Sequence, residues 1–323
     1  MSDLLEKCEV CDALVDEEDL FCANCGTETP HQTTSADSTE LTHRFDCEGC
    51  GASMSYDASA QNLLCPFCGS EHLAEQPPSR SLAARRVVPF RLQHSEAMVR
   101  MRQWLGRGFW RPGDLAGEAV VTRMLPVYVP YWVFEAFTFT YWTADTNQVP
   151  YSASGDWRPM AGEHHGRHEG VLVGASSALA PRETVAICPF DLAPGVPLDQ
   201  IDLENATVEQ FRIHRRFARP LAQEALEYLE RQACRQYVPG QCRNLQVNVR
   251  LEGLSSEPVL LPVWVMTYRY KGRMFRFLLN GQTGKASGQA PFSWKKAFSL
   301  IGIVVAIAIA ILLLFVFGAA MSR

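Results

Sequence analysis

Eight of the eleven cysteines in this 323-residue chain form four Cys-x-x-Cys pairs near its N-terminus. The pairs are Cys8 and Cys11, Cys22 and Cys25, Cys47 and Cys50, and Cys65 and Cys68. Ten residues separate the first two pairs, and fourteen separate the last two. Four thiolates that a short hairpin brings together match the tetrahedral coordination of Zn²⁺. We therefore predict two structural Zn²⁺ sites with four cysteine ligands each.

Other cysteine chemistry fits the spacing less well. Glycine follows three of the pairs (Gly26, Gly51 and Gly69), as expected where the backbone turns left-handed so that N–H groups face sulfur. Four protein ligands leave no position for water or substrate, so the sites are predicted to be structural. A redox pair would need a βαβ unit, which the pattern does not indicate. Iron is the alternative metal, because the CEGC-G and CPFC-G segments resemble rubredoxin knuckles, although the intervening loop is short.

The charge of the N-terminal cysteine-rich module distinguishes between two kinds of partner, proteins and nucleic acids. Residues 1–80 carry 16 Asp and Glu against 3 Lys and Arg, a net of −13, while the rest of the chain carries +8, which together give −5. Nucleic-acid affinity comes largely from Lys and Arg, and each tetrathiolate zinc centre adds about −2. We therefore expect binding of cytoplasmic proteins rather than nucleic acid. The alternative is a membrane-tethered, nucleic-acid-associated zinc protein whose middle domain supplies the basic surface.

The C-terminal segment 297–322 contains no charged residue. Within it, Leu300–Ala320 would span about 30 Å as a helix, the thickness of a bilayer core. We predict a single transmembrane helix over 297–322, integral to the cytoplasmic (inner) membrane. Lys295 and Lys296 precede it, which places the large N-terminal part in the cytoplasm. The acidic N-terminus without an apolar run and the reduced thiols favour the same side.

A folded middle domain must connect the cysteine-rich N-terminal segments to the apolar C-terminal segment. We predict zinc ribbons over 1–30 and 44–74, linkers over 31–43 and 75–84, and an α+β cytoplasmic domain over 85–290 that is rich in strands. Within this domain the pattern predicts a strand at Arg85–Leu92, a helix at Glu96–Leu105, one or two strands over Val120–Trp142, strands at Val171–Ala175 and Thr184–Cys188, a helix from Asn205 or Thr207 to about Tyr237, and strands at Leu245–Leu251, Val259–Tyr270 and Arg273–Leu279.

A weak internal repeat runs through the same domain. VVPF (87–90), a helix and LPVYVPYW (125–132) parallel ICPF (187–190), helices and LPVWVMTY (261–268). The comparison indicates two related strand–helix–hairpin units. Chance similarity between proline-containing strands is the alternative.

Several features of the middle domain could suggest further chemistry. The histidine-rich segment 163–169 lacks an HExxH spacing, so we expect a solvated loop rather than a metal site. The segment 281–286 (GQTGKA) lacks the spacing of a phosphate-binding loop and is predicted to be a β-turn. The aromatic run in 128–142 could stack bases or bind lipid, and core packing is favoured. We expect ordinary thiols at Cys188, Cys234 and Cys242, and a solvated helix face at Arg212, Arg215, Arg216 and Arg219.

The CxxCG knuckles, the segments LPVYVPYWVF and LPVWVMTYRYKGRMFRFLLNGQTGKASGQAP, and the C-terminal apolar helix together resemble a family of bacterial zinc-ribbon membrane proteins. Such proteins are often labelled as primosomal replication helicase-like. That label implies an ATPase, and the chain has no phosphate-binding loop to match it. The resemblance implies instead a non-enzymatic, membrane-anchored adaptor linked to envelope-stress assemblies of the phage-shock type.

Overall fold

The structure is a computed structural model that describes residues 6–8, 14–15, 43–56, 64–76, 84–151, 155–201 and 207–321. Two short strands, β1 (Glu6–Lys7) and β2 (Leu14–Val15), form an antiparallel pair. The other strands are β3 (His43–Cys47), β4 (Ser53–Tyr56), β5 (Leu73–Gln76), β6 (Arg86–Val87), β7 (Val120–Thr146), β8 (Arg158–Gly174), β9 (Thr207–Glu209), β10 (Cys242–Tyr270), β11 (Arg273–Asn280) and β12 (Ala286–Gly288).

These ten strands form one mixed sheet in the described part of the chain. The strand order is β12-β11-β10-β7-β9-β4-β3-β5, with β6 paired to β10 and β8 paired to β7. The helices are α1 (His94–Gly106), α2 (Leu115–Glu118), α3 (Pro181–Ala186), α4 (Arg215–Arg235) and α5 (Trp294–Met321). The chain is therefore a strand-rich mixture of helices and strands with one apolar C-terminal helix, as the sequence predicts.

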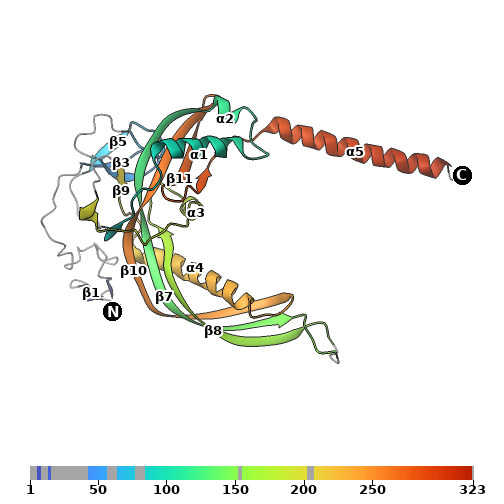
Figure 1. Cartoon of the computed structure of the whole chain (residues 1–323), viewed down its shortest axis with the longest axis horizontal. Helices are drawn as coiled ribbons and strands as arrows, with labels where there is room; N and C mark the ends of the chain where they lie inside the picture. The colour runs from blue at the N-terminus through green and yellow to red at the C-terminus, as the bar shows by residue number, and fades with distance from the viewer. Residues whose placement is uncertain are drawn as a thin grey trace.

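Two very long antiparallel strands, β7 and β10, form the spine of the sheet (Figure 1). They have 27 and 29 residues and are rich in β-branched and aromatic side chains, which suit a pleated surface. Three register shifts interrupt their pairing. Such irregularities increase local bending, in keeping with the curved course of both strands in Figure 1.

The arrangement agrees with two related units. Val127 of the first LPV motif pairs directly with Val263 of the second, so the motifs cross at equivalent positions. The second half of β7 pairs with β8, and the second half of β10 pairs with β11. Helix α1 packs against β10 and β11, whereas α4 packs against β8, β10 and β7. The helix of the second unit thus contacts strands of both units.

Two predicted elements differ from the structure at α3 and α4. The segment 184–188 was expected to be a strand, but helix α3 begins at Pro181 and includes Thr184. Proline suits the first helical position, and the Glu183 side chain accepts a hydrogen bond from the Ala180 backbone N–H at 2.9 Å. The next helix, α4, begins at Arg215, because the sheet recruits residues 207–209 as β9.

The histidine-rich segment 163–169, predicted to be a loop, lies within strand β8. It pairs with β7 over most of its length. Its glycines mark places where other side chains approach the strand closely. A Cβ at Gly162 would lie 2.6 Å from the Trp142 ring, and one at Gly166 would lie 2.6 Å from Glu230 Oε1. Here the glycines signal close packing on a strand rather than a turn.

The second ribbon shares a core with the sheet. Strand β4 pairs with β9, and Gln210 N–H donates to the Ser53 carbonyl at 2.9 Å. Met54 and Phe67, both buried, belong to the same apolar cluster as Val127 of β7. The segment 75–84, predicted to be a linker, follows the ribbon in the sequence. In space, however, the ribbon packs directly against the sheet.

Helix α5 extends away from the rest of the molecule (Figure 1). Its first 18 residues, Trp294–Ile311, have a mean hydropathy of 1.9, and hardly any of their side chains are buried. Among the described residues this is one helix long and apolar enough to cross a membrane. The large apolar side chains described in this helix, up to Ile311, are exposed, which is compatible with a membrane span.

Candidate metal centre

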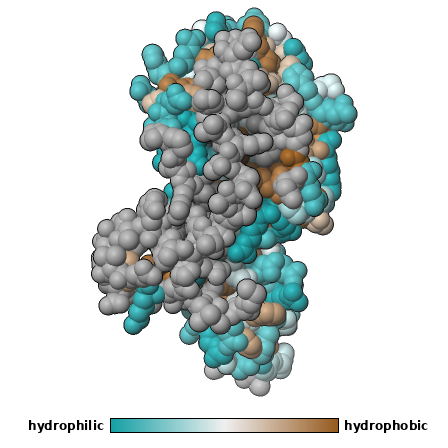
Figure 2. Space-filling model, turned by 90° about the vertical axis from the view of Figure 1, so that its left-hand side faces the viewer, coloured by the Kyte–Doolittle hydropathy of each residue, from teal (hydrophilic) through white to brown (hydrophobic). Residues whose placement is uncertain are grey.

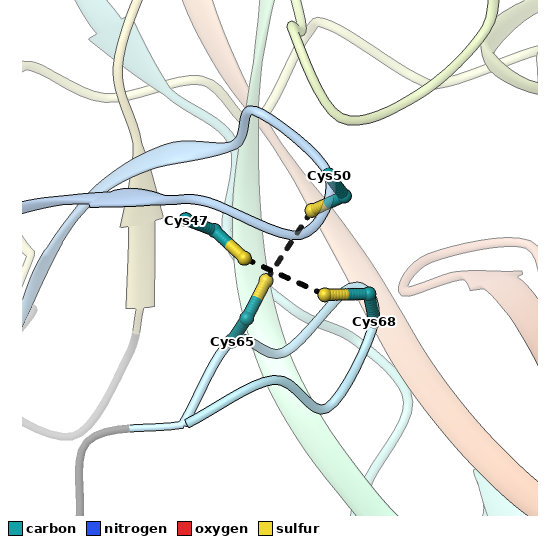
Figure 3. Close-up of side chains that lie close together, drawn as sticks. All are labelled: Cys47, Cys50, Cys65 and Cys68. Atoms are coloured by element: carbon teal, nitrogen blue, oxygen red, sulfur yellow. Dashed lines mark hydrogen bonds between the residues drawn. The ribbon is translucent and has the colours of Figure 1, made fainter. Parts of the chain in front are cut away.

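Four thiols of the second ribbon point toward a common centre (Figure 3). Cys47 ends strand β3 and Cys50 lies in the turn that follows, while the turn 66–68 presents Cys65 and Cys68. The sulfur atoms of Cys47 and Cys68 are 3.5 Å apart, and so are those of Cys50 and Cys65. The structure therefore brings together all four cysteines that the sequence assigns to this ribbon, and they can hold one metal ion.

Both Cys-x-x-Cys turns have the expected backbone conformation. Gly51 and Gly69 have φ angles of 74° and 77°, in the left-handed region where a side chain is unfavourable. Their N–H groups donate to the carbonyls of Cys47 and Cys65, at 2.8 and 2.9 Å. The predicted left-handed conformation of these two glycines is confirmed, while their own N–H groups bond to carbonyl oxygens and not to sulfur. Gly26 lies outside the described residues.

The thiols influence one another's ionisation. A hydrogen bond from the Cys65 thiol lowers the pKa of Cys50 to about 5, whereas the same bond and burial raise the pKa of Cys65 far above its usual range. Burial also raises the pKa of Cys68 to about 11. The Cys50 thiolate forms readily, whereas Cys65 and Cys68 need a cation to replace their protons. Cys47 and Cys65 are buried and Cys68 is exposed, so it is the set of four sulfur ligands that would leave a bound ion no open position for substrate.

The ribbon is held on the sheet by polar contacts as well as by its core. Arg212 Nη2 lies 2.6 Å from both carboxylate oxygens of Asp46. The side-chain amide of Gln210 donates to Ser55 Oγ at 3.1 Å. Both partners follow β9 directly. The position of the metal centre is therefore fixed relative to β7 and β10 rather than left to a linker.

A buried carboxyl group lies beside this junction. Glu209, in β9, is fully buried and accepts hydrogen bonds from Ser176 Oγ at 2.8 Å and from the Ser177 and Ala178 N–H groups. Its Oε2 has no hydrogen-bond partner among the described residues. Burial outweighs the hydrogen bonds and raises the pKa of Glu209 to about 7. Sequence patterns gave no signal for this group, because a glutamate in a three-residue strand is usually exposed.

Glu209 should make the stability of the fold pH-dependent. Its pKa is about 4.3 in an unfolded chain, so between pH 4.3 and 7 only the folded state keeps the proton, and stability falls as pH rises. We expect Glu209→Gln to flatten this dependence and to stabilise the fold at pH 8 by about 2 kcal/mol. Urea unfolding at pH 5 and pH 8 measures the difference. The exposed Glu169→Gln is the control, and an equal pH dependence in both variants would contradict the assignment.

The first ribbon is described only in part. Cys8 follows β1 and is buried, and strands β1 and β2 pair with each other. Cys11, Cys22 and Cys25 lie outside the described residues. The prediction of a second four-cysteine site therefore stays a prediction.

The other candidate segments are placed clearly. The segment 281–286 is a turn that leads into strand β12, as predicted, and Lys285 Nζ donates to the Cys188 carbonyl. In the aromatic run, Tyr131, Trp132 and Phe134 are buried as predicted, whereas Phe137 and Tyr141 are exposed. Arg215, predicted on a solvated helix face, is buried.

One cluster was missed by the sequence interpretation. His164 and His168 of β8 meet Glu230 and Cys234 of α4, and three of these residues can together hold a metal ion. The four-residue spacing places His164 and His168 on one face of β8, and Glu230 and Cys234 on one face of α4. The sequence did not show that these faces meet, because the histidine segment was expected to form a loop.

No protein-family model matches the chain, and no solved structure matches it. The chain is similar to "Uncharacterized protein YdjG" of Bacillus subtilis (strain 168), with 24% identity over 312 residues that cover 77% of this chain and 90% of that protein. The likeness extends over most of both chains and brings no assigned activity with it.

Proposed function

We propose that this protein is a non-enzymatic, membrane-anchored adaptor whose metal-stiffened ribbon binds cytoplasmic proteins. The observation that carries the proposal is the closed four-cysteine centre fixed on one side of a rigid sheet, in a chain that also bears an exposed apolar helix. A closed centre cannot bind substrate, but it holds the surrounding turns in one conformation. The resemblance to bacterial zinc-ribbon membrane proteins supports the same role and adds envelope stress as the process.

We propose Zn²⁺ as the metal. Four thiolates suit both Zn²⁺ and iron, and the short loop between the two pairs favours a zinc ribbon over a rubredoxin-like site. The proposed inventory is two structural Zn²⁺ ions, one in each ribbon. Elemental analysis of the purified protein measures this directly.

The ribbon offers an acidic surface to a partner. Residues 43–76 contain five Asp and Glu against one Arg. Glu48, Glu71 and Glu75 are exposed, and a tetrathiolate zinc centre would add about −2. Figure 2 shows this side of the molecule, where the coloured surface is mainly hydrophilic with small apolar patches. We propose a partner with a basic surface, because charge complementarity steers association.

The nucleic-acid alternative needs a basic surface that is free to meet phosphate. Several arginines of the sheet domain are already paired with carboxylates: Arg212 with Asp46, Arg276 with Glu183, and Arg243 with Asp145. These pairs reduce the positive charge available to a polyanion. We therefore favour a protein partner.

The region where α5 begins supports insertion into a membrane. Trp110 stacks on Phe292 with ring centroids 5.5 Å apart, and Trp294 contacts Phe292 and Phe298. All four of these rings are exposed. Tryptophan with neighbouring lysines is typical of the membrane–water interface, and Lys295 and Lys296 lie here. We propose that this aromatic cluster lies at the cytoplasmic face of the inner membrane.

A charge-reversal experiment tests the adaptor proposal. Full-length protein is captured from detergent-solubilised membranes as wild type, as Glu48→Lys/Glu71→Lys, and as the control Glu163→Lys/Glu252→Lys on the far end of the sheet. We expect a specific protein to co-purify with the wild type and the control, and to be reduced at least about tenfold in the ribbon variant. Raising the salt concentration should have the same effect.

Two results would contradict the proposal. The first is equal recovery of partners with all three proteins. The second is tight binding of DNA or RNA by the protein at physiological salt, which would favour the nucleic-acid alternative.

A further inference from the structure

A second group of metal-binding side chains lies far from the ribbon, between strand β8 and helix α4. His164 and His168 are four residues apart on β8 and therefore face the same side of the strand. Glu230 and Cys234 are four residues apart on α4 and therefore lie one turn apart on one helix face. Helix α4 packs along β8 (Figure 1), so the two faces meet.

The donor atoms are close enough for one ion. His164 Nδ1 lies 2.8 Å from Glu230 Oε2, and His168 Nε2 lies 2.6 Å from Glu230 Oε1. The donor atoms of His164, Glu230 and Cys234 all lie within 4.8 Å of one another. Metal–ligand bonds of about 2.0–2.3 Å in a tetrahedron place donor atoms about 3.3–3.8 Å apart. Small side-chain rotations are therefore enough to bring the donors of His164, Glu230 and Cys234 onto one ion.

Polar side chains surround the carboxylate at the centre of the cluster. The Glu230 side chain is fully buried, and four side chains hydrogen-bond to its two oxygens: Thr138, Thr140, His164 and His168. Buried carboxylates in proteins are paired, hydrogen-bonded or bound to a metal, and here both oxygens are already oriented toward imidazole nitrogens that can share an ion with them.

The surroundings hold the carboxylate in place and leave a route for an ion. Thr138 and Thr140 of β7 donate to its two oxygens at 2.8 and 2.5 Å. Such contacts orient a ligand in many metal sites. Gly166 leaves room for the carboxylate, because a Cβ there would lie 2.6 Å from Oε1. Each histidine side chain is 17% exposed, so solvent reaches the ring side of the cluster.

We propose that His164, Glu230 and Cys234 form a metal site that joins α4 to β8, with His168 holding the other oxygen of Glu230. An imidazole, a carboxylate and a thiolate are donors that suit Zn²⁺ or a similar transition-metal ion, and they do not suit Mg²⁺ or Ca²⁺. The site is independent of the adaptor proposal and of the ribbon centre. Its role is structural: the ion holds α4 against the long strands.

Metal content of single variants tests the site. Full-length protein in detergent is stripped with EDTA, supplied with Zn²⁺, freed of excess ion and analysed for zinc. The variants are His164→Gln, His168→Gln and Cys234→Ala, and the controls are His165→Gln, which lies on the exposed side of the same strand, and Cys242→Ala. We expect His164→Gln and Cys234→Ala to carry one Zn²⁺ fewer than the wild type, His168→Gln to bind it at least about tenfold more weakly, and both controls to match the wild type.

A second measurement separates lost binding from lost folding. Circular dichroism of the proteins as purified, before EDTA treatment, should be the same for the wild type and each variant, because the ribbon centre keeps its metal in all of them. Zinc contents that are equal in the wild type and all three variants would overturn the proposal and leave the cluster as a hydrogen-bonded carboxylate. A lower zinc content that appears only in variants with a changed spectrum would overturn it as well.

Discussion

Replacing Cys47 or Cys65 by serine is expected to remove one Zn²⁺ per chain and to destabilise the sheet domain along with the ribbon. In peptide models a structural Zn²⁺ site contributes about 10–16 kcal/mol to folding. Part of the ribbon's core is also the core of the sheet: Ala52, Met54 and Phe67 belong to one apolar cluster with residues of β7 and β10. When the metal is lost these side chains lose their fixed packing, so the effect should spread to the sheet.

The measurement is zinc content together with urea unfolding of each variant. We expect a loss of several kcal/mol in the unfolding free energy of the sheet domain, with the transition still cooperative. Cys188→Ala is a matched control, because this half-buried thiol belongs to the same core without contacting the centre. A ribbon variant that loses zinc while the sheet keeps its wild-type transition would show that the shared core does not couple the two parts.

The features of the fold that could be predicted from the sequence are those that local contacts define. Local signals were sufficient for the second Cys₄ cluster, because Cys-x-x-Cys spacing and Gly51 fix a turn with few outside contacts. They were also sufficient for helix α1 and for the strands predicted at Val259–Tyr270 and Arg273–Leu279, which pair as β10 and β11. In each case residues close in sequence make the contacts that define the element.

Elements that depend on distant partners were less predictable. β9 is three residues long and exists because both β4 and β7 pair with it. Strand β8 carries charged residues on its exposed side and glycines on its packed side, a pattern that suggests a loop until α4 and Trp142 are placed against it. The His164–Glu230 contact joins residues 66 positions apart, so no local pattern could have placed it.

The attachment of the ribbon to the sheet also depends on residues that are far apart in the sequence. Composition identifies 75–84 as a linker, and nothing in it indicates that Arg212 will meet Asp46 across 166 residues of chain. The consequence for function is physical. A binding surface fixed on a rigid body is already oriented with respect to β7 and β10, so a partner loses less entropy on binding than it would with a flexible module.

Truncation of the chain after Gln289 is expected to move the protein from the membrane to the soluble fraction. The removed segment contains the whole of α5, and its Leu, Ile, Phe and Val residues each favour the bilayer centre by about 0.3–0.6 kcal/mol. The fold should remain intact, because β12 ends at Gly288 and the Tyr268 hydroxyl still donates to the Gln289 carbonyl, at 2.6 Å. The truncation also removes the stacking of Phe292 on Trp110, the Ser293 N–H bond to the Trp110 carbonyl, and the packing of Ala290 against the core of β10 and β11.

Fractionation with carbonate extraction measures the change, and zinc content measures whether the fold survives. A full-length Ala308→Arg variant is an intermediate case, because an arginine near the bilayer centre costs about 2.5–3.5 kcal/mol while the length of the chain is unchanged. It should be extracted more readily than the wild type and less readily than the truncated protein. If the truncated protein stays in the carbonate-resistant pellet in a folded state, another part of the molecule holds the membrane, and α5 packs against a protein partner instead of lipid.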